Sequence, residues 1–293
     1  RAYDVDVDVF DLFDFMDVET TAINEIIDKG RSELTYADAL NLVIERVKIL
    51  TDSESSLTGI ETGFKKLNKH FGGWQPTDFV VIGARPSVGK TTFAVNACMN
   101  IARAGHHVLF ISLEMNETEL VSKIASVLTG VDSERITHGE MNDDERGRVA
   151  KASVENGAWT SRIHIEDISS LKDTQVAGVV QRAVKRLGVE VIVIDYLQCI
   201  TSDGNSPVER MTNISRACKS VAKATKKRLI ELSQLKRRDG AEEDPEMSDL
   251  REAGQIEADG DIIVMLGRPR GAAMLRCKVV KNKVGPIGVV EIP

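Results

Sequence analysis

The chain contains 293 residues, of which 42% are hydrophobic, so it is long enough for one large or two small domains with a sizeable core. No run reaches the roughly eighteen consecutive apolar residues of a membrane span, and the acidic N-terminus lacks the basic start and apolar stretch of a secretory signal. Membrane insertion and export are therefore not predicted, and the cytoplasm is the expected compartment. The four cysteines lack paired spacing, which predicts neither a zinc site nor a disulfide framework.

The net charge of −7 is unevenly distributed along the chain. Residues 1–30 contain nine acidic residues against Arg1 and Lys29, which already equals the net charge of the whole chain. Residues 262–293 carry six basic residues against Glu291 alone. This C-terminal part of the sequence is therefore locally basic and suited to holding a polyanion.

The first residues of the chain are too apolar for a plain disordered tail, because residues 1–30 alternate Asp and Val and then run into Phe, Leu and Met. We interpret them as the edge of a larger domain. The spacing of apolar residues next predicts an amphipathic helix from Tyr36, with Thr35 as its N-cap and Asp38 in its first turn. This helix and the polar linker after it occupy residues 31–56, and its apolar stripe is expected to pack either on its own domain or on a neighbouring subunit.

Over residues 57–293, short apolar runs alternate with helical stretches, which predicts an α/β fold with a mostly parallel sheet flanked by helices. The predicted strands are Phe79–Ile82, Val108–Ser112, Val191–Ile194, Leu229–Leu232 and Ile262–Leu266, and the predicted helices are Ser122–Leu128, Thr174–Leu187 and Val208–Thr225. Two further predicted strands form a C-terminal β-hairpin with a basic tip: Ala273–Val280, the turn Lys283–Pro286, and Gly288–Ile292.

The segment from Ala84 to Thr91 reads Ala-Arg-Pro-Ser-Val-Gly-Lys-Thr and stands between a predicted strand and the helical stretch Thr92–Ala102. This is the context of a phosphate-binding loop, although Ala84 replaces the usual first glycine and Gly-Lys-Thr alone is common by chance. Backbone N–H groups are expected to face the phosphates, Lys90 to contact the outer phosphates, and the Thr91 hydroxyl to ligate Mg²⁺. The predicted contacts of ATP, or of another nucleoside triphosphate, are Ala84, Arg85, Pro86, Ser87, Val88, Gly89, Lys90, Thr91 and Thr92.

Three polar side chains follow other predicted strands. Asp195 is predicted to ligate Mg²⁺ together with Thr91, because ligands of open α/β sheets bind at the carboxyl ends of the strands. Glu114 is the predicted general base and Gln234 the predicted sensor of the γ-phosphate. Each has an ordinary alternative, as a turn residue, a helix-start acid or a polar loop residue, and the phosphate-binding loop favours the functional interpretation.

Several strings then occur in the order and spacing found in DnaB-type replicative helicases, which the chain resembles from about Thr58 to its end. They are Ala84 to Thr91, Ser112-Leu-Glu-Met115, Ile194-Asp-Tyr-Leu-Gln198, Ser233-Gln-Leu235 and Met247-Ser-Asp-Leu-Arg-Glu-Ala-Gly254. The amphipathic helix before them looks like the family's linker helix, which docks on the next subunit. Residues 1–30 resemble the last part of the family's N-terminal collar domain.

The resemblance implies a RecA-like motor in a homohexameric ring that encircles single-stranded DNA, unwinds duplex at the replication fork and works with a primase and a helicase loader in a bacterial or phage replisome. Family DNA contacts fall on Arg251, Glu252 and Gly254. The family pattern Lys-x-Arg-x-Gly-Pro, whose two basic residues reach the neighbouring subunit's nucleotide, reads here Lys281-Asn-Lys283-Val-Gly-Pro286. Lys283 keeps the charge of the family arginine and loses its bidentate fork.

Two other functional classes share part of this pattern. A RecA-like recombination or signalling ATPase has the phosphate-binding loop and Asp195 but separates no strands; the helix at Tyr36 and the segment from Asp249 to Gly254 favour the helicase. A ring platform that binds nucleotide without turning it over is suggested only by Lys283. A steady-state ATPase assay with and without single-stranded DNA distinguishes the three.

Overall fold

The computed structural model describes residues 35–52, 57–235, 245–250, 253–269 and 271–293. The chain divides into two units, residues 1–55 and residues 56–293. The predicted remnant at residues 1–30 lies outside the described residues. The two units are treated separately below.

The described part of the first unit is helix α2, Tyr36–Asp52. It starts where its cap was predicted, because the Thr35 hydroxyl accepts a hydrogen bond from the Asp38 N–H at 3.2 Å, and the Asp38 carboxylate accepts one from the Thr35 N–H at 3.1 Å. Hydrogen bonds from Thr35 also lower the pKa of Asp38. The apolar side chains of the predicted stripe are exposed on this unit, namely Tyr36, Leu40, Val43, Ile44 and Val47. Which surface covers them remains a prediction.

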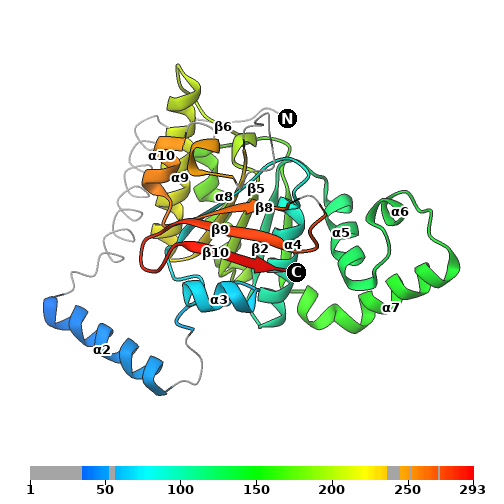
Figure 1. Ribbon diagram of the computed structural model, residues 1–293, viewed down its shortest axis with the longest axis horizontal. Helices are drawn as coiled ribbons and strands as arrows, with labels where there is room; N and C mark the ends of the chain where they lie inside the picture. The colour runs from blue at the N-terminus through cyan, green and yellow to red at the C-terminus, as the bar shows by residue number, and fades with distance from the viewer. Residues whose placement is uncertain (1–34, 53–56, 236–244, 251–252, 270) are drawn as a thin grey trace, which may run out of the picture. The chain divides into compact units, whose positions relative to one another are not determined.

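Among the described residues of the second unit, eight strands form one sheet in the order β10-β9-β8-β1-β7-β5-β2-β3 (Figure 1). The strands from β8 to β3 in this order pair in parallel, and β9 and β10 add an antiparallel hairpin at one edge. The bounds are β1 Phe79–Ala84, β2 Val108–Ser112, β3 Ile163–Asp167, β5 Val191–Asp195, β7 Arg228–Gln234, β8 Ile262–Gly267, β9 Leu275–Asn282 and β10 Gly288–Ile292.

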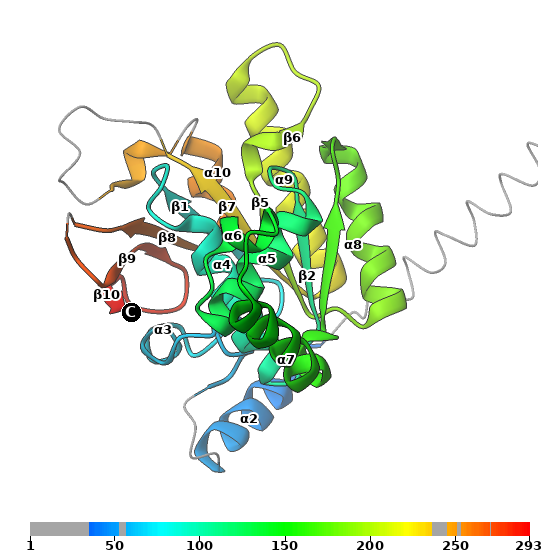
Figure 2. The ribbon, with the colours of Figure 1, turned by 90° about the vertical axis from the view of Figure 1, so that its right-hand side faces the viewer.

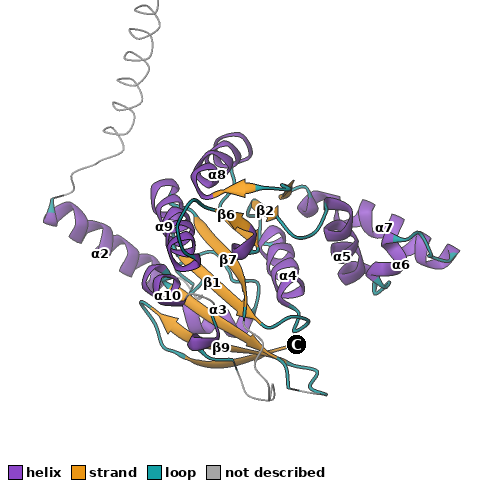
Figure 3. Cartoon of the chain, turned by 90° about the horizontal axis from the view of Figure 1, so that it is seen from above, coloured by secondary structure: helices purple, strands orange, loops and turns teal. Residues whose placement is uncertain are grey.

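Helices cover both faces of the sheet, which is why its central strands are continuous apolar runs (Figure 3). On β1, Val80 and Ile82 pack with one layer of helices, and Phe79 and Val81 pack with the other, as the two-residue period of a strand requires. The first layer contains α3 Lys65–Phe71, α4 Lys90–Arg103 and α5 Glu117–Thr129, and the second contains α8 Asp173–Leu187, α9 Pro207–Thr225 and α10 Ala253–Asp259.

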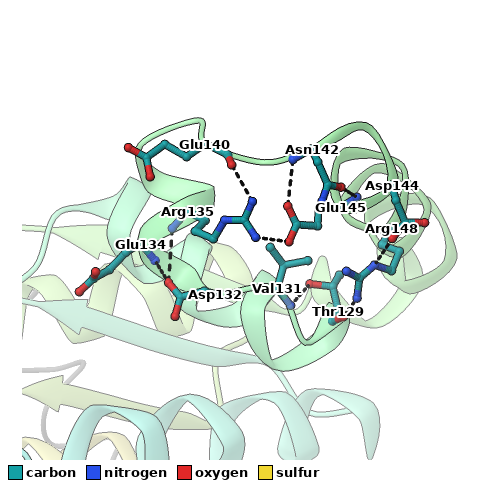
Figure 4. Close-up of polar contacts among 10 residues, drawn as sticks. All are labelled: Thr129, Val131, Asp132, Glu134, Arg135, Glu140, Asn142, Asp144, Glu145 and Arg148. Atoms are coloured by element: carbon teal, nitrogen blue, oxygen red, sulfur yellow. Dashed lines mark hydrogen bonds and ion pairs between the residues drawn. The ribbon is translucent and has the colours of Figure 1, made fainter.

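Helices α6, Ser133–Thr137, and α7, Asp143–Thr160, pack with α5 beyond the sheet (Figure 2). Polar contacts fix this group, as Figure 4 shows. Arg135 forms an ion pair with Glu145 and donates a hydrogen bond to the Glu140 carbonyl at 2.9 Å. Asn142 and Glu145 cap α7 reciprocally, with both hydrogen bonds at 2.9 Å.

The predicted fold is confirmed: the sheet is mostly parallel, helices flank it, and a β-hairpin ends the described chain. Strand β3 and helices α3, α6, α7 and α10 had no counterpart in the sequence-based prediction. Two short elements, β4 Leu171–Lys172 and β6 Ile200–Thr201, pair with each other outside the main sheet. Within the described residues, no helix is both long and apolar enough to cross a membrane.

Candidate nucleotide-binding site

The predicted phosphate-binding loop joins the carboxyl end of β1 to the N-terminus of α4. Ser87 and Gly89 adopt left-handed conformations, with φ of 66° and 110°. A Cβ added to Gly89 would meet only the Thr92 Cβ, at 4.0 Å, so the backbone angle, and not a lack of space, favours glycine here. Such alternating turns orient successive N–H groups toward one side, and the N-terminus of α4 adds its own free N–H groups. The loop therefore forms a cradle for an anion.

Lys90, the first residue of α4, lies among acidic and aromatic groups. Its Nζ is 2.9 Å from Asp195 Oδ1, 3.8 Å from Glu114 Oε2 and 3.9 Å from the centre of the Tyr196 ring. The Asp195 side chain is only 2% exposed, whereas that of Glu114 is 48% exposed. Desolvation, Cys199 and the nearby carboxylates raise the pKa of Tyr196 to about 12, so its phenol stays protonated. The Lys90 ammonium is thus fixed at the mouth of the loop.

The two predicted Mg²⁺ ligands meet at the floor of the site. The Thr91 hydroxyl donates a hydrogen bond to Asp195 Oδ2 at 2.7 Å. Hydroxyl and carboxylate oxygens are hard ligands, and Mg²⁺ bound with a nucleotide takes few protein ligands because phosphates and water supply the rest. Within the described residues, no group of three His, Cys, Asp or Glu side chains could hold a metal ion, so this sparse pair fits Mg²⁺ carried by a nucleotide better than a resident metal ion.

A pocket of about 420 Å³ opens over the loop. Register explains why the predicted residues meet there: Gln234 pairs with Ala84 between β7 and β1, and Asp195 pairs with Ser112 between β5 and β2. The lining residues are Ala84, Arg85, Pro86, Ser87, Gly89, Lys90, Thr91, Thr92, Glu114, Lys123 and Gln234. Of the predicted nucleotide contacts, Val88 does not line this pocket and packs against the core.

Three side chains at the site had no role assigned from the sequence. Lys123 of α5 lines the pocket, Tyr196 contacts Lys90, and Gln198 holds the end of β7. The Gln198 amide donates to the Ser233 hydroxyl at 2.9 Å and to the Gln234 carbonyl at 3.3 Å, and its oxygen accepts the Gln234 N–H at 3.2 Å. The string that contains Tyr196 and Gln198 was recognised in the sequence, but only the fold shows which groups they contact.

Arg85 connects the phosphate-binding loop to a distant segment. Its Nη2 lies 3.4 Å from Asp249 Oδ2, and the two side chains are 13% and 1% exposed. The same carboxylate oxygen accepts the Glu246 N–H at 3.0 Å. Asp249 ends the short helix Met247–Asp249, just before the predicted DNA contacts. Of these, Arg251 and Glu252 lie outside the described residues, and Gly254 is exposed in the first turn of α10.

Lys281 and Lys283 are not brought to the pocket of their own chain. Lys283 Nζ lies 3.4 Å from Asp261 Oδ1, and the other Asp261 carboxylate oxygen accepts the Phe79 N–H at 2.9 Å. Lys281 Nζ donates to carbonyls at the end of α10, including that of Ala258 at 3.3 Å. Asp261 therefore marks the amino end of β1, and the six residues of that strand place the phosphate-binding loop about 20 Å away. A role in hydrolysis is open to these lysines only at another subunit.

A glycine-containing loop between a strand and a helix, with Lys90 and Thr91 at the helix start and Asp195 on a neighbouring strand end, defines a P-loop nucleotide-binding protein. A comparison with protein families then narrows the class. The family described as "DnaB-like helicase C terminal domain" matches residues 59–293, and the chain belongs to this family.

Curated relatives and solved structures agree with this assignment. The chain is 32% identical to the replicative DNA helicase DnaB of Geobacillus stearothermophilus, over 87% of this chain and 59% of that protein. It is 34% identical to the replicative DNA helicase DnaB of Buchnera aphidicola subsp. Baizongia pistaciae, over 90% of this chain and 60% of that protein. The chain thus spans about three fifths of the length of these relatives.

Two solved structures share the fold. One is a structure of an isolated ATPase domain, which superposes with a TM-score of 0.78 at 28% identity and covers 89% of this chain and 95% of that one. The other, described as "The Structure Of A DnaB-Like Replicative Helicase And Its Interactions With Primase", gives a TM-score of 0.74 at 27% identity, covering 92% of this chain and 68% of that one. The sheet and its helices are therefore those of a RecA-like helicase domain.

Proposed function

We propose that this chain is the ATP-hydrolysing motor of a hexameric DnaB-type replicative helicase, which moves along single-stranded DNA and separates duplex at the replication fork. The observation that carries the proposal is the joint placement of Lys90, Thr91 and Asp195 under one pocket, with Thr91 and Asp195 2.7 Å apart. Membership of the helicase family, and the names of the relatives, support the substrate. Mg²⁺ supplies charge neutralisation when it is bound with the nucleotide.

Each residue of the pocket has a distinct task in this proposal. The loop N–H groups and Lys90 hold and neutralise the phosphates, while Thr91 and Asp195 hold the metal ion. Glu114, which is half-exposed and can meet solvent, orients the attacking water and accepts its proton. Gln234 ends β7 at the pocket and is held by Gln198, so it is placed to report the γ-phosphate.

The site is completed by other molecules. Because Lys281 and Lys283 lie at the opposite end of β1 from their own loop, we assign them to the nucleotide of the adjacent subunit in a homohexamer. Arg251, Glu252 and Gly254 are assigned to the phosphates of single-stranded DNA, which position a strand without reading its sequence. A primase is a proposed partner, since one of the similar helicases is described with its primase interactions. A helicase loader and a cytoplasmic bacterial or phage replisome complete the proposal.

Glu114→Gln tests the assignment of the base. The variant should bind Mg·ATP with unchanged affinity, because Lys90, Thr91 and Asp195 are retained, and should lose turnover by a factor on the order of 10² to 10⁴. Equilibrium nucleotide binding and single-turnover hydrolysis measure the two effects. The matched control is Glu117→Gln, an exposed glutamate three residues further along the chain that lies outside the pocket lining. Equal losses of binding and turnover in Glu114→Gln would show that Glu114 is structural.

A further inference from the structure

A second cavity, of about 490 Å³, adjoins the phosphate pocket and shares Gly89 and Thr92 with it. Four separate parts of the chain line it: α4, the segment that enters α3, the connection from β8 to β9, and the end of β10. A further cavity of about 470 Å³, next to Gln198 and α9, shares no lining residue with the phosphate pocket. Of these two cavities, the first is continuous with the proposed triphosphate site.

One side of the cavity is a single face of α4. Thr92, Asn96 and Asn100 line it, and their spacing of four residues places them one above another along the helix. Eight residues of α-helix span about 12 Å, which suits a ribose and a base that extend away from phosphates at the helix N-terminus. The cavity therefore has both the direction and the length that a nucleoside requires.

An aromatic side chain is held over this helix face. Asn100 Nδ2 donates to the Gly63 carbonyl at 2.8 Å, which anchors the segment before α3 on α4. Gly63 has φ 88°, and a Cβ there would lie 3.0 Å from the Ala97 Cα, so the close approach requires glycine. The next residue, Phe64, is partly buried and stacks on Phe93 at 4.8 Å between ring centres.

The opposite wall carries positive charge and further apolar groups. Arg268 is exposed at the end of β8 and lines the cavity, as do the buried side chains of Leu275 and Ile292. A guanidinium plane stacks on aromatic rings and is weakly hydrated, so it suits the face of a base. The amide of Asn96 can both donate and accept hydrogen bonds, so it does not select one arrangement of base-edge groups over another.

We infer that this cavity is the nucleoside subsite, which takes a purine base against Phe64 and Arg268; the inference rests on the proposed binding of ATP at the loop. Recognition comes from stacking and apolar contact. The subsite therefore prefers purine over pyrimidine nucleotides, because a larger ring buries more surface, and it separates adenine from guanine only weakly.

The test compares Mg·ATP with magnesium tripolyphosphate, which carries the phosphates without base or ribose. Equilibrium affinities of both ligands are measured for the whole chain, for Arg268→Ala and for Phe64→Ala. Each variant should weaken ATP on the order of 10-fold, the usual loss when a stacked base loses its partner, and should leave tripolyphosphate within about twofold. Arg210→Ala removes an exposed arginine from the separate cavity near Gln198 and should change neither affinity.

Arg268→Ala decides the outcome, because an exposed side chain can be removed without unfolding the segment. If the unaltered chain binds ATP and Arg268→Ala binds it equally well, the base lies elsewhere and the inference is overturned, while the proposed function stands. A Phe64→Ala variant that weakens both ligands equally would overturn the assignment of Phe64. An unaltered chain that binds neither ligand would instead contradict the proposed function.

Discussion

At the scale of single residues, the nucleotide site uses groups that the fold keeps charged, whereas Glu231 in the middle of β7 is kept neutral. Its side chain is fully buried, and the nearest polar partner is the Cys218 thiol, 3.7 Å from Oε1. Burial raises the pKa of Glu231 well above the ordinary value of a glutamate. The folded chain therefore holds a proton that the unfolded chain releases at neutral pH.

This buried acid predicts a pH dependence of stability. Because the folded pKa is the higher one, the contribution of Glu231 is fully present below the unfolded pKa, near pH 4.3, and is lost as pH rises toward the folded pKa. Glu231→Gln removes the titration and keeps the shape. Relative to the unaltered chain, the variant should gain up to about 1.4 kcal/mol of unfolding free energy for each pH unit above pH 5 within that window. Urea unfolding at pH 5, 6.5 and 8 measures it, and a constant difference would contradict the assignment.

At the scale of elements, the predictable part of the fold is the part whose burial is uniform. Strands β1, β2 and β5 are buried along their whole length, so continuous apolar runs revealed them. Strand β3 was missed because it is a half-exposed edge strand that contains His164 and Glu166. Helix α7 was missed because it is polar on nearly all sides, and only a pattern of charges and the Asn142 cap mark it.

The site divides in the same way. Lys90, Asp195, Glu114 and Gln234 were predictable because each stands at the end of an apolar run or in the loop motif, and parallel strands bring their carboxyl ends together. The contacts of Gln198 with β7 join segments about 35 residues apart in sequence. The Arg85 to Asp249 ion pair joins segments even further apart. No local pattern contains that information, so it needed the structure.

The Arg85 to Asp249 ion pair is the element-scale contact with the clearest consequence, because it ties the phosphate-binding loop to the segment that precedes the predicted DNA contacts. Removing one partner of a buried pair leaves a charge with poor solvation and typically costs about 3 to 5 kcal/mol. Arg85→Met and Asp249→Asn should each lower the unfolding free energy of residues 56–293 by such an amount, and the double variant should lose clearly less than the sum. A double-mutant cycle from urea unfolding measures this coupling, and strictly additive losses would show that the two side chains do not interact.

At the scale of the whole molecule, the pocket of one chain lacks the basic residues that the family places at the nucleotide. Lys283→Ala should leave ATP binding intact and reduce hydrolysis on the order of 10³-fold, because a cation supplied by a neighbour stabilises charge that develops in the transition state. Lys90→Ala should be inactive through its own loop. In rings mixed from the two variants, interfaces that pair an intact loop with an intact Lys283 form, so ATPase activity should return on mixing.

The matched control is Lys278→Ala, a basic residue on the same strand, which should hydrolyse ATP at the ordinary rate. Lys283→Arg should keep or raise turnover, because a planar fork can engage two phosphate oxygens. Mixed rings that stay inactive despite confirmed subunit exchange, together with normal hydrolysis by Lys283→Ala, would show that the hairpin tip is an ordinary surface turn.

The measurement closest to the central claim is the steady-state ATPase rate with and without single-stranded DNA. A motor that moves on a strand couples the two ligands, so saturating single-stranded DNA should raise the turnover of the unaltered chain several-fold and leave Glu114→Gln inactive. Double-stranded DNA of the same sequence serves as the control for general polyanion effects. A rate that single-stranded DNA does not change, in a preparation shown to bind both ATP and the strand, would contradict the motor and favour a platform that binds nucleotide without moving.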